Sequence, residues 1–202
     1  MRRWQWVGIG IVIVVALVIG VFLLIVGGNA PVVSGVGKQA CVTSTQQGSA
    51  TCLRFPVISG DNLNGQSVTL PAVFKGKTAL VIIPFDENQQ VSAQTWLPLA
   101  RDLASSSADF VYYNVPIFPS MAAPMRTLIR AGMVATISDA QLRAITITVF
   151  LDDRDQFLSS LNIADVSAMQ VFLLDGDGDV IWRGSGVYTD AQGDTLHAAL
   201  TD

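Results

Sequence analysis

The two cysteines, Cys41 and Cys52, are the most reactive side chains that this sequence offers, and ten residues separate them. In an oxidising compartment, two cysteines normally pair. Closing so short a loop would stabilise the fold by about 2–3 kcal/mol on the chain-entropy model. A redox-active pair is the alternative, but the spacing is not Cys-x-x-Cys and no helix N-terminus is evident to lower a thiol pKa. The sequence therefore favours a structural disulfide over a redox site.

The acidic residues and the single histidine offer little for metal chemistry. Residues 175–179 (DGDGD) resemble the first ligand positions of a calcium loop, but Val180 and Gly186 stand where that loop needs Gly and Glu. We therefore interpret the segment as a hairpin turn. His197 is the only histidine, which excludes a histidine-rich metal site. We expect no cofactor and no catalytic triad.

The N-terminus has the composition of a membrane anchor. Residues 7–28 carry no charge over 22 positions, which is long enough to span a bilayer as a helix. Arg2 and Arg3 precede the run, and the positive-inside rule then places the N-terminus in the cytoplasm and the rest outside. A cleaved signal peptide is the alternative, but Pro31 follows the only small-residue exit. We expect a single-pass anchor over residues 1–28 in contact with the lipid bilayer.

The charge balance excludes one class of partner. Arg2 and Arg3 are two of the twelve basic residues, and all sixteen acids follow the apolar run, so the remainder of the chain has a formal net charge of −6. An acidic domain repels phosphate backbones, and nucleic acid is therefore not an expected partner.

The remaining residues divide into a linker and one α/β domain. Residues 29–54 are rich in Gly, Ser, Thr and Gln and contain both cysteines, whereas residues 55–202 alternate apolar strand and helix patterns. This alternation predicts a sandwich around a mixed sheet. The expected elements are a hairpin over 55–70, a strand at 78–85, a helix at 89–105, a strand at 110–115, one or two helices over 120–143 broken near Gly132 and restarted at Ser138 or Asp139, a strand at 144–151, a helix at 152–162, a hairpin over 171–182 and a helix at 190–200.

Two segments resemble the thioredoxin-like superfamily. Residues 70–85 (LPAVFKGKTALVIIPF) are similar to the stretch before the active site in membrane-anchored thiol oxidoreductases and peroxiredoxins, and residues 171–186 (VFLLDGDGDVIWRGSG) are similar to their closing hairpin. The resemblance covers about residues 55–200. It implies a thioredoxin-like three-layer sandwich with a mixed central sheet.

The resemblance also indicates where a thiol active site would lie. With Phe85 as the aromatic residue ending the first core strand and Pro98 as the helix proline of the family, the two cysteine positions fall on Gln90 and Ala93. Neither side chain can form a thiolate, so thiol–disulfide exchange at this site is excluded. The family's cis-proline position falls on Met169, where a cis peptide bond would cost about 2.5–4 kcal/mol.

A second resemblance is weaker. The thioredoxin-like proteins of the mitochondrial ATP-synthase assembly factor ten family also lack these features. They are similar to this chain in a Gln-Gln/Trp helix (Gln89, Gln90 and Trp96 here), in residues 145–163 (ITITVFLDDRDQFLSSLNI) and in a Trp-Arg-Gly ending. The resemblance implies an assembly factor or chaperone for a membrane complex.

An aromatic and methionine-rich segment suggests where such a protein partner would bind. The sequence favours a strand and loop within the core, and the alternative is an adaptable apolar binding surface, whose candidate residues are Trp96, Tyr112, Tyr113, Phe118 and Met121. The sequence thus predicts a membrane-anchored, extracytoplasmic binding or assembly module that is not an enzyme. The alternative function is a redox protein that uses Cys41 and Cys52.

Overall fold

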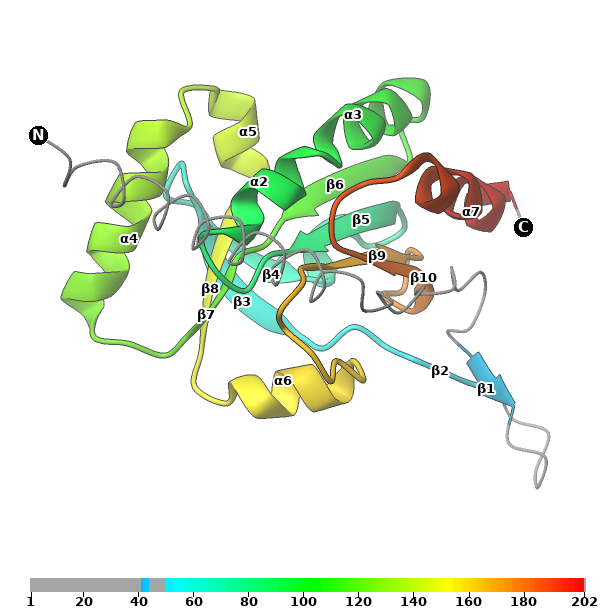
Figure 1. The fold of residues 1–202 in the computed structure, drawn as a ribbon, viewed down its shortest axis with the longest axis horizontal. Coiled ribbons are helices and arrows are strands. Elements are labelled where there is room, and N and C mark those ends of the chain that lie inside the picture. The colour runs from blue at the N-terminus through cyan, green and yellow to red at the C-terminus, as the bar shows by residue number, and fades with distance from the viewer. Residues whose placement is uncertain (1–40, 44–49, 202) are drawn as a thin grey trace, which may run out of the picture. The chain divides into compact units, whose positions relative to one another are not determined.

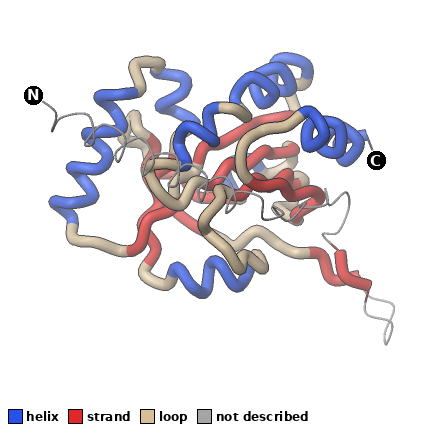
Figure 2. The backbone as a smooth tube through the Cα atoms, in the orientation of Figure 1, coloured by secondary structure: helices blue, strands red, loops and turns tan. Residues whose placement is uncertain are grey.

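A computed structural model describes residues 41–43 and 50–201, and the surroundings of side chains from residue 53 onward (Figures 1 and 2). The expected anchor over residues 1–28 and most of the linker lie outside the described residues. Within the described residues, no helix combines the length and apolar character needed to cross a bilayer.

The first sheet is organised around strand β5 (Thr78–Ile83), which matches the strand expected at 78–85. Its order is β10-β9-β5-β6. Strand β6 (Phe110–Asn114) runs parallel to β5, whereas β9 (Gln170–Leu174) is antiparallel to it and forms the expected hairpin with β10 (Val180–Ser185). The mixed sheet that the sequence pattern predicted is therefore present.

Both faces of this sheet are buried, because apolar residues occupy its central strands from Ala79 to Ile83 in β5 and from Val171 to Leu174 in β9. Along β5, Ala79, Val81 and Ile83 belong to one core cluster, and Leu80 and Ile82 belong to the other. A strand alternates its side chains between the two faces of the sheet, so an unbroken apolar run requires cover on both. The result is a helix–sheet–helix arrangement.

The helices supply that cover (Figure 1). Ala100 of α3 (Leu97–Ser106) and Leu196 of α7 (Asp190–Thr201) pack into one cluster, and Phe157 of α6 (Arg154–Ser160) packs into the other. The remaining helical segments are η1 (Ala72–Phe74), α2 (Gln89–Gln94), α4 (Ala123–Thr136) and α5 (Ala140–Ile145).

The single central sheet of the prediction is divided in two. A second four-stranded sheet has the order β4-β3-β8-β7, with β3 at Ile58–Asn62, β4 at Ser67–Leu70, β7 at Ile117–Pro119 and β8 at Ile147–Leu151. The chain passes from one sheet to the other at Val115 and Pro116: Val115 donates its N–H to Ile82, while the carbonyl of Pro116 accepts from Val149. Because proline has no N–H to donate, the ladder is interrupted there.

Three helix boundaries differ from the prediction. The helix expected at 89–105 is two helices, α2 and α3. Helix α3 begins at Leu97, and Pro98 in its first turn has no backbone N–H to donate to the preceding turn, so the helical hydrogen bonds are interrupted there. Helix α4 continues through Gly132 and ends at Thr136, so the predicted break near Gly132 is wrong. Helix α5 occupies the first residues of the strand expected at 144–151, which begins only at Ile147.

Aspartate side chains begin two of the helices in the expected way. Asp139 accepts hydrogen bonds from the backbone N–H groups of Gln141 and Leu142 at the start of α5, as predicted. Asp153 accepts one from Gln156 at the start of α6. Such caps satisfy backbone donors that the helix itself leaves unpaired.

A tryptophan is at the centre of the core beneath α2 and α3. Trp96 is 0% exposed, its indole N–H donates to the carbonyl of Gly186 at 2.9 Å, and its ring packs against Trp182 and Tyr188 at centroid distances of 5.9 and 5.3 Å. It therefore joins the junction of α2 and α3 to strand β10 and to the segment before α7.

We expect Trp96→Ala to lower the free energy of unfolding by about 3–5 kcal/mol, because it empties a large buried site. Urea unfolding followed by far-ultraviolet circular dichroism measures this. Val91→Ala is the matched control from the neighbouring helix, since Val91 is 71% exposed, and it should change stability by less than about 0.5 kcal/mol. Equal stability of the two variants would contradict the packing described here.

Candidate functional site

The positions that the resemblance assigns to active-site thiols lie at the start of α2, after the C-terminal end of β5. Gln90 is half-buried near the beginning of the helix, and Ala93 is 2% exposed within the core. Residues 84–88 form the loop that leads from strand β5 to helix α2. Neither position offers a nucleophile or a group that accepts electrons, so the local chemistry is limited to hydrogen bonding by the Gln90 amide.

Gln89, the neighbour of the first vacated position, braces this region. Its Oε1 accepts the backbone N–H of Phe85 at 2.8 Å, and its Nε2 donates to the carbonyl of Val166 at 2.8 Å. Its own N–H donates to Asp86 at 3.1 Å. One buried amide thus ties the end of β5 to the segment that precedes β9. The sequence marked Gln89 only through the weaker resemblance, and its bracing role had no signal in the sequence pattern.

Gln90 is next to a buried asparagine with an unused acceptor. Asn114, at the end of β6, is 7% exposed and its Nδ2 lies 3.5 Å from Oε1 of Gln90. Among the described residues, its Oδ1 has no hydrogen-bond partner. A buried polar atom without a partner costs about 1–3 kcal/mol, and such atoms often mark sites that a ligand or a water completes.

A groove of about 610 Å³ opens beside Gln90, between α2 and α4. Its α2 side is polar and its α4 side is mostly apolar. The lining residues are Glu87, Gln90, Gln94, Phe118, Leu128, Ile129, Gly132, Met133, Thr136 and Ile137. The vacated active-site position therefore faces a surface that is suited to bind an apolar segment with some polar groups at its margin.

Helix α4 forms the apolar wall of this groove and remains largely exposed along its length. It has 14 residues and none of them is buried, although Ile129 and Met133 are half-buried. Met125 and Leu128 are 51% and 65% exposed. An amphipathic helix normally buries its apolar face, so α4 presents apolar area that the rest of the described domain does not cover.

The residues predicted to form a binding surface do not lie together. Trp96 is fully buried, so its assignment to a surface is wrong: at the junction of α2 and α3 its ring packs against Trp182. Tyr112 and Tyr113 are half-buried and pack against opposite core clusters, as successive strand residues must. Burial raises the pKa of Tyr113.

Of the other two residues predicted to form the binding surface, one lines the groove and the other does not. Phe118 lines it, and its ring stacks on Phe150 at 5.3 Å. Met121 is half-buried and is not among the groove residues. Leu128, Ile129 and Met133 do line it, and the sequence analysis missed them; their helical spacing within residues 120–143 was the available signal.

Met169 is the residue that the resemblance places at the family's cis-proline position. Its side chain is 0% exposed and belongs to the core cluster beneath α2. Its carbonyl accepts the N–H of Gly186 at 3.0 Å. Within the described residues, the cis peptide bond is Leu70–Pro71, and the bond that precedes Met169 is trans.

The two cysteines lie in a short antiparallel pair ahead of the domain core. Strands β1 (Cys41–Thr43) and β2 (Ala50–Cys52) pair with Cys41 opposite Cys52. Residues directly opposite in an antiparallel pair have Cα atoms about 4.5–5.5 Å apart, which is within the range of a disulfide. The backbone register is therefore compatible with the predicted bridge, which stays a prediction.

The acidic segment 175–179 is a closed turn. Oδ1 of Asp175 accepts the backbone N–H groups of Asp177 and Asp179 at 3.0 and 2.9 Å, so it is used in shaping the hairpin. Gly178 has a φ of +88°, a conformation that favours glycine. No group of three or more metal-ligating side chains occurs among the described residues.

Comparison with known proteins supports the fold and adds no sequence relative. No protein-family model matches the chain, and no curated protein has a significant match to its sequence. Yeast Sco1 with copper bound is 13% identical, with a TM-score of 0.51 over 75% of this chain and 95% of that chain. BsSco, described as a member of the Sco family of cytochrome c oxidase assembly proteins, is 15% identical, with a TM-score of 0.50 over 74% and 95%.

A third solved structure is the thioredoxin domain of a thiol-disulfide oxidoreductase from Bacteroides vulgatus, at 19% identity and a TM-score of 0.49 over 72% of this chain and 94% of that chain. At such identities a likeness concerns the fold alone. The mixed sheet, its two helical layers and the two Sco structures agree with the architecture that the two sequence segments implied. The domain that follows the linker has the thioredoxin-like fold.

Proposed function

We propose that this protein is a membrane-anchored, extracytoplasmic binding module that assists the assembly of a membrane complex without thiol–disulfide exchange. One observation carries the proposal: Gln90, which the resemblance assigns together with Ala93 to the thiol positions of the family, borders an apolar groove. A site that has lost its nucleophiles while keeping an open apolar surface is suited to binding rather than to catalysis.

The groove indicates the chemistry of its occupant. Leu128, Ile129 and Met133 offer flexible apolar side chains along one wall, and Glu87, Gln90 and Gln94 offer a carboxylate and two amides along the other. We propose that an amphipathic helix of a membrane-complex subunit binds here, with apolar residues against α4 and a basic residue facing Glu87. Helices commonly bind grooves of this kind through residues spaced three or four apart.

The membrane anchor supports a membrane partner. A single uncharged span over residues 7–28 would hold the domain within a linker's length of the bilayer, which raises the effective concentration of partners in the same membrane. BsSco is itself named as an assembly protein, so the thioredoxin-like fold serves assembly elsewhere. A fold does not fix a function, so the groove beside Gln90 remains the main support for the proposal.

We expect the full chain to remain in the membrane fraction after extraction at alkaline pH, because residues 7–28 would span the bilayer. The domain should be digested by protease added from the extracytoplasmic side, since Arg2 and Arg3 hold the N-terminus inside. Replacing both arginines with Gln is the control for orientation. Release of the chain into the soluble fraction, or protection of the domain from protease, would contradict the topology.

We expect a photo-crosslinking residue at Leu128 to form one discrete adduct with a membrane protein in cells, because this side chain lines the groove and is 65% exposed. The matched control is Val187, which is 54% exposed and is not among the groove residues. Immunoblotting measures the adduct, and mass spectrometry identifies the partner.

A second substitution shows whether that adduct depends on the groove. A Cβ atom built at Gly132 meets nothing within 4 Å, so Gly132→Trp fills the groove without a backbone clash. It should abolish the adduct from Leu128, whereas Ala135→Trp, at an exposed position on the same helix that does not line the groove, should leave it. Equal adducts from Leu128 and Val187, or an adduct that survives Gly132→Trp, would exclude the groove as the binding site.

We expect Gln90→Cys with Ala93→Cys to form an intramolecular disulfide in a variant that has Cys41 and Cys52 changed to Ser. The two positions are three apart in the first turns of α2, where helix amides lower a thiol pKa. Mass spectrometry under mild oxidation detects the loss of two hydrogens, and the single Gln90→Cys variant is the control. Two thiols that stay reduced would show that these are not the vacated positions of a thioredoxin-like site.

A further inference from the structure

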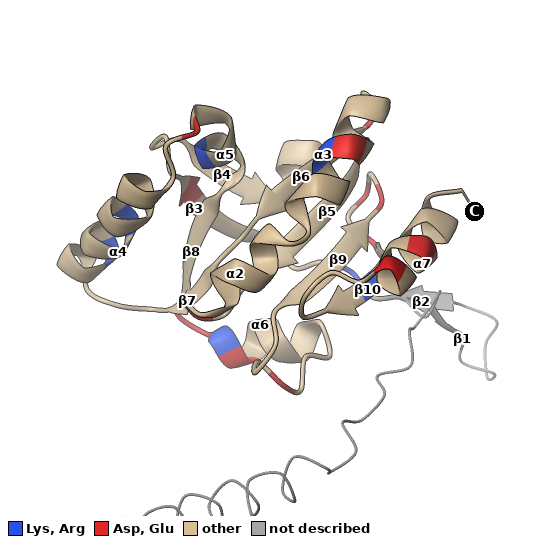
Figure 3. Cartoon of the chain, turned by 45° about the horizontal axis from the view of Figure 1, so that its top comes forward, with Lys and Arg blue, Asp and Glu red and all other residues tan. Residues whose placement is uncertain are grey.

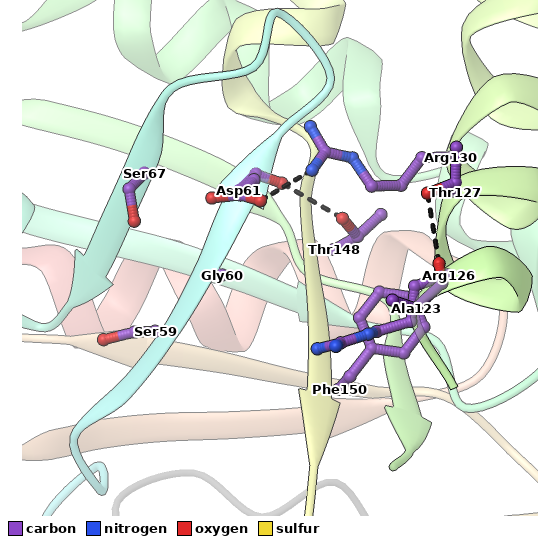
Figure 4. Close-up of a pocket in the computed structure, with 10 residues that line it drawn as sticks. All are labelled: Ser59, Gly60, Asp61, Ser67, Ala123, Arg126, Thr127, Arg130, Thr148 and Phe150. Carbon is purple, nitrogen blue, oxygen red and sulfur yellow. Dashed lines mark hydrogen bonds and ion pairs between the residues drawn. The ribbon is translucent and has the colours of Figure 1, made fainter. Parts of the chain in front are cut away.

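A second cavity lies on the other side of α4, between this helix and the second sheet. It has a volume of about 460 Å³, within the range of sites that bind small molecules. Figure 4 shows the side chains of α4 and of strands β3, β4 and β8 that surround it. The lining residues are mainly polar: Ser59, Gly60, Asp61, Ser67, Ala123, Arg126, Thr127, Arg130, Thr148 and Phe150.

One of the two arginines in this cavity has its charge satisfied. Nη1 of Arg130 contacts Oδ2 of Asp61 at 2.6 Å, and its Nη2 donates to the backbone carbonyl of Asn62 at 3.0 Å. This pair joins α4 to β3 and contributes no net charge to the cavity. Arg130 is therefore a structural contact of α4 with the sheet.

The other arginine, Arg126, retains an uncompensated charge. Its guanidinium carbon lies 5.9 Å from the centroid of the Phe150 ring, and Figure 4 shows the side chain extended across that ring. Within the described residues no carboxylate lies within ion-pair distance of it. Stacking on an aromatic ring orients the planar guanidinium while leaving its N–H donors free, as in arginines that bind carboxylate or phosphate groups.

Hydroxyl groups surround the same space. Thr148 is 1% exposed and donates its hydroxyl hydrogen to the carbonyl of Asp61 at 3.1 Å, and Thr127 donates to Ala123 at 3.1 Å. Ser67 has no hydrogen bond from its hydroxyl to any described residue, so it can donate to a ligand. The guanidinium group of Arg126 and the free hydroxyl of Ser67 are hydrogen-bond donors at one cavity, and such donors are suited to bind an anionic oxygen group.

The charge distribution makes this cavity distinctive in an acidic domain. Helix α4 carries Arg126 and Arg130 and no acid, whereas acidic residues predominate on α7 and in the turn before β10 (Figure 3). With Arg130 paired to Asp61, the cavity keeps one net positive charge. An anion repelled by most of the domain surface would be attracted here.

We propose that this cavity binds a small polar molecule that carries one oxyanion group, a carboxylate or a phosphate. Arg126 pairs with the oxyanion, and the Ser67 hydroxyl donates a hydrogen bond to the polar remainder of the ligand. The close approach of β3 to β8 forms the cavity floor and requires glycine at position 60, because a Cβ atom there would overlap the backbone oxygen of Thr148. The site is independent of the groove between α2 and α4.

Calorimetric titration of the full chain in non-ionic detergent tests the proposal with three probes: ribose 5-phosphate, gluconate and uncharged ribose. We expect saturable binding of at least one of the two anions and none of ribose. Arg126→Gln should weaken that binding at least about tenfold, the loss typical of one charge-assisted contact. Arg101→Gln, which removes an exposed arginine of α3, should leave the affinity unchanged.

A second pair of variants tests anion binding at the cavity without changing Arg126. Ser67→Glu places a carboxylate at the cavity and should abolish anion binding, whereas Ser105→Glu, on the exposed face of α3, should not. The proposal is overturned if neither anion saturates the protein, if ribose binds as well as ribose 5-phosphate, or if Arg126→Gln or Ser67→Glu binds the anion like the unaltered chain. Circular dichroism of each variant confirms that it is folded.

Discussion

The burial of β5 on both faces is the constraint on which the rest of the domain depends. Five consecutive residues of this strand, from Ala79 to Ile83, are 0% exposed. Each apolar side chain of this size gains about 1.5–3 kcal/mol when it leaves water, so the strand is stable only between two layers of cover. Helices α3 and α7 on one face and α6 on the other provide these layers, and the start of α2 is thereby fixed at the C-terminal end of β5.

The position of α2 has a polar component as well. Gln89 accepts from Phe85 and donates to Val166, and both bonds join parts of the chain that apolar packing alone would leave free to shift. A buried amide that is fully paired specifies one arrangement, because any displacement leaves its groups without partners. The start of α2, to which the resemblance assigns the thiols of the family, is in this protein held in place by Gln89 and borders an open groove.

Helix α4 buries none of its side chains, and both of the cavities described above adjoin it. One face, from Ala123 through Arg126 and Thr127 to Arg130, lines the polar cavity, and the opposite face lines the apolar groove. Its contacts with the sheet include the Arg130–Asp61 pair and the stacking of Arg126 on Phe150. Partly exposed ion pairs contribute about 0–1 kcal/mol, so α4 is held less firmly than the helices that bury apolar side chains.

The sequence by itself determined the elements with strong local signals. The apolar run at β5, the Asp-Gly hairpin between β9 and β10 and the aspartate caps of α5 and α6 depend on interactions between near neighbours, which a pattern of residue types records. It also indicated the vacated positions Gln90 and Ala93, and the structure places them at the start of α2 after β5.

Only the tertiary structure decided that Trp96 is core, that Tyr112 and Tyr113 face opposite layers, and that Gln90, Phe118 and Leu128 border one groove. Those outcomes depend on which strands pair and how closely α4 approaches the sheet, and such long-range contacts leave no periodic signal in the chain.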